Sequence, residues 1–131
     1  MDAQGVYRDI PKKQAIGRNN MDGYELIEQI QQKSALLDKA LQESKERGVA
    51  SADAEQAYKV ALAKAMLIER DKGTPVTILS DICKGQEEIA GLRRERDIAD
   101  ALYKSSKEAI NVYKIQLRVL QEQAEMEWGR G

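Results

Sequence analysis

Apolar residues between positions 22 and 47 recur at steps of three and four, which is the spacing of one face of a helix. Asp22 is suited to cap the start of this helix, because Glu25 follows three residues later, and Gly48 favours its end. The pattern therefore predicts a helix over residues 22–47. Its inner side is predicted to hold Ile27, Ile30, Leu37 and Leu41.

A second helix is predicted over residues 52–72, where alanine is frequent. Ser51 is suited to cap its start, and the alanines give a narrow helix that allows close approach to a neighbour. Because the polar link at 48–51 is short, the two helices are predicted to form an antiparallel hairpin. The inner side of the second helix is predicted to hold Tyr58, Leu62, Ala65 and Ile68 or Glu69.

The stretch DKGTPVTILSDICKG interrupts the helical pattern twice. Gly73 favours a helix end, and Pro75 prevents the preceding helix from continuing. A short helix over residues 77–84 is predicted to follow. Its surroundings are too apolar for a free loop, so this corner is predicted to fold against the hairpin. The apolar residues concerned are Val76, Ile78, Leu79 and Ile82.

Residues 86–128 contain no proline and are predicted to form one long helix. Strict steps of three and four residues run along it for five to six heptads, as in a coiled coil. We expect this seam to mediate contact between copies of the chain, with Arg96 fixing the register or the choice of partner. The predicted oligomer seam consists of Ile89, Leu92, Arg96, Tyr103, Ile110, Tyr113, Leu117 and Leu120.

A second apolar stripe lies beside this seam and makes the apolar face wider than a two-stranded coil requires. One stripe can cover the hairpin while the other meets a second copy of the chain. The second stripe consists of Ile98, Leu102, Ala109, Val112 and Val119.

These elements predict an all-α fold: an antiparallel helical hairpin, a short helical corner and a long C-terminal coiled-coil-like helix, in an oligomer. Residues 22–131 are predicted to form a single α-helical domain. Residues 1–21 show neither a helical nor a strand period, and we expect them to be a flexible N-terminal arm or leader.

Composition excludes several classes of function. The chain has 131 residues, of which 33% are charged and 5% aromatic, and its net charge is −1, which gives no overall attraction to nucleic acid or to anionic membranes. The absence of histidine removes histidine-based catalysis and ordinary zinc sites. No apolar run is long enough to span a bilayer. We expect no catalytic residues, no metal and no cofactor.

Cys83 is the only cysteine, so an internal disulfide is excluded. A chain without disulfides suits the reducing cytoplasm, which is the location that we predict. Cys83 itself is predicted to be a small, buried apolar residue.

Basic residues on the long helix leave two interpretations open. Several fall at helical steps and can follow a phosphate backbone, whereas the interleaved acidic residues suit an ordinary solvated face of mixed charge. Trp128 is either a cover for a helix end in a dimer or an exposed anchor for another protein. The candidate contacts to nucleic acid or to a partner are Arg93, Arg94, Lys104, Lys107, Lys114, Arg118 and Trp128.

The stretch YELIEQI at 24–30 and the pattern GTPVTI…KG…E.A.LR.ERD.A...Y within 73–103 carry a resemblance. About residues 21 to 128 resemble a family of small α-helical phage and prophage proteins of Gram-positive bacteria, whose genes often lie near recombination functions. The resemblance begins at Met21, which fits an added arm before it. It implies a phage-encoded protein in the host cytoplasm, and it carries no assigned activity.

Three functions are compatible with these features. The first is a non-enzymatic adaptor or inhibitor that binds another protein of DNA metabolism or defence. The second is an accessory nucleic-acid-binding protein of phage recombination, and the third is an oligomeric structural or assembly component. The expected partners are a second copy of the chain and another protein, with nucleic acid as the alternative and no membrane.

Overall fold

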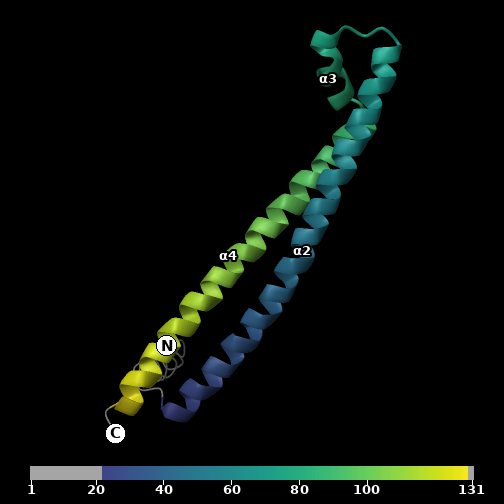
Figure 1. The fold of residues 1–131 in the computed structure, drawn as a ribbon. Coiled ribbons are helices and arrows are strands. Elements are labelled where there is room, and N and C mark those ends of the chain that lie inside the picture. The colour runs from purple at the N-terminus through teal and green to yellow at the C-terminus, as the bar shows by residue number, and fades with distance from the viewer. Residues whose placement is uncertain (1–21, 130–131) are drawn as a thin grey trace, which may run out of the picture. The chain divides into compact units, whose positions relative to one another are not determined.

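The computed structural model describes residues 22–129, and this part of the chain contains three helices and no strand. They are α2 (Gly23–Asp71), α3 (Val76–Lys84) and α4 (Glu87–Gly129) (Figure 1). The prediction of an all-α fold is confirmed. No helix within this part is long and apolar enough to cross a membrane. The predicted arm at 1–21 lies outside the described residues.

The predicted break at 48–51 is wrong, because α2 continues through it as one helix of 49 residues. A glycine inside a helix costs only about 1 kcal/mol, and no proline enforces an end here. Gly48 has another role: a Cβ atom at this position would lie 3.3 Å from the ring of Tyr103. The glycine thus allows α4 to approach α2. The antiparallel partner of α2 is therefore α4, and the hairpin predicted between 22–47 and 52–72 does not form.

Contacts divide the described residues into two units. In the first unit, residues 23–37 of α2 pair with residues 112–129 of α4. Leu26 and Ala124 are buried there, and the Lys33 ammonium lies 5.9 Å from the centre of the Tyr113 ring. In a unit with few buried side chains, each of them carries a large share of the packing energy.

The second unit contains residues 38–71 of α2, all of α3 and residues 87–111 of α4. Its core lies where α3 meets the two longer helices (Figure 1). Leu79 and Cys83 are one turn apart on α3, so both point inward. The buried cluster consists of Tyr58, Ala65, Leu79, Cys83 and Ile89, with Ala61, Leu62, Met66 and Leu92 packed against it.

The inner side of the first half of α2 includes Ile30 and Leu37, which are half-buried as predicted, but it differs by one residue from the prediction at the two other positions. Leu26 and Ala40 are buried, whereas Ile27 and Leu41 are exposed. Adjacent apolar residues fit a helical period in either phase, and packing against α4 selects one of them. The inner side predicted for residues 58–69 is closer to the structure, because Tyr58 and Ala65 are buried there.

The predicted helix start at Asp22 and helix end at Gly73 are both present. The Glu25 N–H donates to Asp22 Oδ1 at 2.8 Å, which caps α2. At the other end, the Thr74 N–H donates to the Glu69 carbonyl and the Gly73 N–H to the Arg70 carbonyl. This is a Schellman motif, and Gly73 has the positive φ of 90° that it requires. Pro75 then directly precedes α3.

The Glu69 side chain links the end of α2 to the start of α4. One carboxylate oxygen accepts a hydrogen bond from Thr74 Oγ1 at 3.0 Å. The other accepts from Gln86 Nε2 at 3.5 Å and lies 3.4 Å from Lys72 Nζ. Because these partners come from the α2–α3 link and from the residue before α4, the carboxylate holds both connections of α3 in place.

Two glycines inside helices should respond in opposite directions to substitution. In Gly48→Val, the new side chain overlaps the Tyr103 ring, so we expect a loss of about 1 to 3 kcal/mol in the free energy of unfolding. In Gly91→Ala, nothing lies within 4 Å of the new Cβ, and we expect a gain of about 0.5 to 1 kcal/mol. Equilibrium urea unfolding of both variants would measure this. Equal effects would mean that Tyr103 does not pack on Gly48.

Candidate interaction surfaces

The eight residues of the predicted oligomer seam are buried or half-buried within one chain. Ile89 and Leu92 join the core around Tyr58, and Tyr103 packs on Gly48. The contact predicted between copies is therefore a contact between α4 and α2 of the same chain. The seam residues that contact α2 in this way are Ile89, Leu92, Arg96, Tyr103 and Tyr113. Ile110, Leu117 and Leu120 are half-buried at the same heptad positions.

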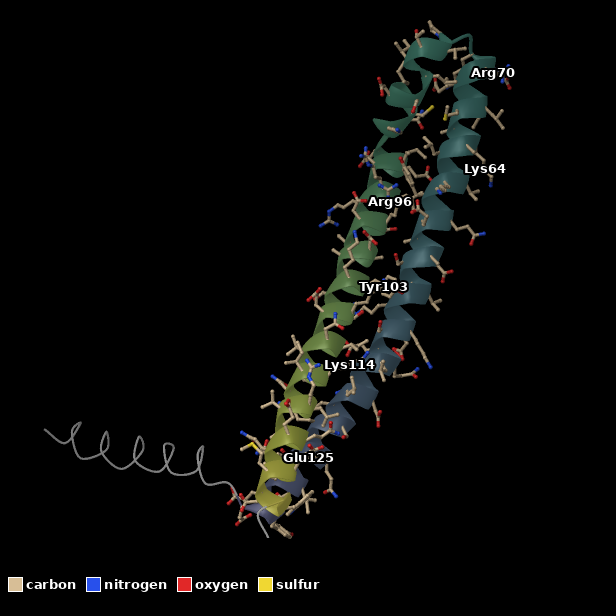
Figure 2. All side chains as sticks on the ribbon, turned by 60° about the vertical axis from the view of Figure 1, so that its left-hand side comes forward. Lys64, Arg70, Arg96, Tyr103, Lys114 and Glu125 are labelled. Atoms are coloured by element: carbon tan, nitrogen blue, oxygen red, sulfur yellow. The ribbon has the colours of Figure 1, made fainter. Side chains whose placement is uncertain are left out.

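Arg96 is the charged member of this seam, and it meets an acidic residue of α2 in the same chain. Arg96 lies on α4 where this helix runs beside α2 (Figure 2). Its guanidinium lies 3.7 Å from Glu55 Oε1 and 4.6 Å from the centre of the Tyr58 ring. It also donates to Asp97 Oδ1 at 2.9 Å, and this hydrogen bond raises the pKa of Arg96. Three partners around one half-buried charge favour a single register of α2 against α4 in the second unit.

Some of the basic residues of α4 already interact with other side chains of the same helix. Lys104 Nζ lies 2.9 Å from Asp100 Oδ2, and the hydrogen bond raises the pKa of Lys104. Lys107 Nζ lies 4.1 Å from the centre of the Tyr103 ring. Both residues belong to the second unit, whereas Lys114 and Arg118 belong to the first. Two of the four candidate phosphate contacts on this row therefore already have partners within the helix.

Arg93 and Arg94 line a shallow depression of about 420 Å³ together with Lys84 of α3. Ala90, Ile98 and Ala101 form its apolar floor. Asp97 also lines it, but its carboxylate is engaged by Arg96. This depression is the part of the second unit where exposed positive charge gathers on both α3 and α4.

Trp128 lies at the end of α4 in the first unit and covers the start of α2. Its Nε1 atom would lie 3.0 Å from a Cβ placed on Gly23. The side chain nevertheless remains 55% exposed. It therefore covers a helix end within one chain, and still presents an aromatic surface to solvent.

The short helix α3 is apolar on more than its inner side. Leu79 and Cys83 are buried, but Val76 is 79% exposed, and Ile78 and Ile82 are exposed one turn apart. As predicted, this corner packs against the rest of the chain, through Leu79 and Cys83, but three of its apolar residues remain exposed. We call Val76, Ile78 and Ile82 the α3 patch. The sequence indicated that α3 is apolar. It did not show that the other helices cover only one side of α3.

The Cys83 thiol is fully buried, as predicted. Burial, and to a smaller extent the charge of Glu69, raise the pKa of this thiol above its ordinary value of 9.0. Full burial separates this thiol from solvent in the folded chain, which is typical of a structural cysteine. Within residues 22–129 no group of three or more His, Cys, Asp or Glu side chains is arranged to hold a metal ion.

Comparisons with protein-family models, curated proteins and solved structures find no match for this chain. Its function is therefore inferred from its exposed surfaces.

Proposed function

We propose that this chain is a non-enzymatic protein-interaction module, an adaptor or inhibitor that acts on another protein. The observation that carries the proposal is the α3 patch. A nine-residue helix that buries Leu79 and Cys83 has no need of further large apolar side chains for its own packing, yet it exposes three. Large apolar side chains that remain exposed on a short helix are typical of surfaces that bind other proteins.

The positions of these side chains suit recognition by a groove. Ile78 and Ile82 are four residues apart and share one side of α3, as do the anchors of helices that insert into an apolar groove. The Schellman motif, Pro75 and the Glu69 hydrogen bonds fix the link before α3. A pre-ordered helix loses little conformational entropy when it binds, which favours affinity.

The biological setting of this proposal rests on the resemblance to phage and prophage proteins. In that setting the chain is phage-encoded, resides in the host cytoplasm, and acts on a host or phage protein of DNA metabolism or defence. Lys104 and Lys107 are engaged by Asp100 and Tyr103, and the other basic candidates on α4 are divided between the two units, which makes nucleic-acid binding the weaker alternative. Its strongest support is the depression shared by Lys84, Arg93 and Arg94.

Affinity capture from lysate of infected cells tests the proposal with three baits. The first is the wild-type chain, and the second carries Ile78→Lys with Ile82→Lys. The matched control carries Val112→Lys with Ile115→Lys, two exposed apolar residues of α4. We expect a protein that the wild type and the control retain, that the α3 variant loses, and that nuclease treatment leaves bound. Equal capture by all three baits would refute the role of α3, and loss on nuclease treatment would favour nucleic acid.

A further inference from the structure

One edge of α2 in the second unit carries four exposed residues at steps of seven. Seven residues are close to two helical turns, so the four side chains lie in a row on one side of the helix. The row, which we call the α2 edge, consists of Glu43, Ala50, Ala57 and Lys64.

The two alanines make the α2 edge hollow. Ala57 and Lys64 line an open depression of about 510 Å³ with apolar side chains, among them Val60 and Ile68. Glu43 and Ala50 line a second depression of about 280 Å³. Small residues on a helix surface allow another helix to approach to an axial distance of about 8 Å. The shape of the α2 edge therefore suits a helix with an equally narrow side.

The order of charges along the α2 edge identifies that helix. From Glu43 to Lys64 the row reads acid, alanine, alanine, base. When a second copy of the edge runs antiparallel, Glu43 of each copy faces Lys64 of the other, and Ala50 faces Ala57. A parallel copy would place Glu43 against Glu43 and Lys64 against Lys64. The row is thus complementary to itself in the antiparallel direction alone, as a two-fold symmetric contact requires.

Other charges lie beside the α2 edge, and one of them, Glu46, lines the second depression together with Glu43. Arg47 lies 3.6 Å from Glu43 in the same chain, and both side chains are exposed, so this pair contributes little. Glu88 of α4 lines the same depression as Lys64, as do Glu69 and Lys72.

We propose that two copies of this chain associate antiparallel, α2 against α2, through the α2 edge. This inference goes beyond the proposed function and does not rest on it, because the α2 edge and the α3 patch are different surfaces. It also replaces the oligomer seam predicted on α4 with a contact on α2.

Sedimentation velocity of the purified full chain over a range of concentrations tests the inference. We expect the wild type to form a dimer. Glu43→Lys and Lys64→Glu should each weaken dimerisation by about tenfold or more, because like charges then meet at two symmetric positions. An equimolar mixture of the two variants should restore association. In the mixed dimer the introduced lysine of one variant meets the introduced glutamate of the other, and the unchanged Lys64 meets the unchanged Glu43. Lys45→Glu, an exposed charge reversal on α2 outside the edge, is the matched control.

Several outcomes would overturn the inference. They are a monomer at all concentrations, equal weakening by Lys45→Glu, and a mixture that associates no better than either variant alone. Helix content from circular dichroism checks that each variant is folded. Because only purified protein is used, a negative result here leaves the capture experiment on the α3 patch unaffected, and the reverse also holds.

Discussion

Tyr58→Ala should lower the free energy of unfolding by about 3 to 5 kcal/mol, which is a large part of the stability of a chain of this size. Tyr58 is 5% exposed and belongs to the buried cluster that α2, α3 and α4 share. Truncation leaves a cavity between three helices, and it removes the ring on which the Arg96 guanidinium lies. The midpoint of urea unfolding, followed by circular dichroism, measures the loss.

Two control variants make this result specific. Tyr58→Phe keeps the ring, so it should retain most of the stability. Tyr24→Ala removes a tyrosine that is 76% exposed, and its effect should stay within about 0.5 kcal/mol. A small loss for Tyr58→Ala would mean that the cluster is not the core of the second unit.

Leu26→Ala should lower the free energy of unfolding by about 2 to 4 kcal/mol. Leu26 is 2% exposed and, with Ala124, is one of the buried side chains of the first unit. Few other contacts compensate for its loss, because most neighbouring side chains in this unit are exposed or half-buried. Equilibrium unfolding measures the total effect, and hydrogen exchange of the amides at 23–37 shows whether the loss is local.

Ile27→Ala is the matched control for this prediction, because Ile27 is adjacent to Leu26 and 43% exposed. We expect it to cost less than about 1 kcal/mol. The comparison also shows which side of α2 faces α4 in the first unit, because the apolar pattern of the sequence favoured Ile27 as the inner residue. A larger effect at Ile27 than at Leu26 would support the phase derived from sequence and contradict the structure.

The helix boundaries that depend on local chemistry could be predicted. Asp22 caps a helix with its own side chain, and Gly73 and Pro75 end one through backbone geometry. These residues act within a few positions of themselves, so their effects can be deduced from the sequence. As a result, the ends predicted for the helices at 77–84 and 86–128 differ from the structure by at most one residue.

The features that depend on distant partners could not be predicted in the same way. Gly48 resembles a helix end in the sequence, whereas in the structure it makes room for Tyr103, a residue of another helix. The seam on α4 was found by its period, but a period does not tell whether the facing helix belongs to the same chain. The exposure of the α3 patch could not be predicted for a related reason. Apolar composition shows that burial of a side chain is favourable, but it does not show whether another part of the chain covers that side chain.

The single thiol of this chain gives the second unit a native probe of local opening. Cys83 is fully enclosed by the cluster at α3, and an enclosed thiol reacts with labelling reagents only when that cluster opens. The rate at which this sulfur atom is modified therefore measures how often α3 separates from the longer helices, and no engineered label is needed. A partner that binds α3 would lower the rate at which Cys83 is modified. The modification rate of this native thiol would therefore report whether the partner is bound.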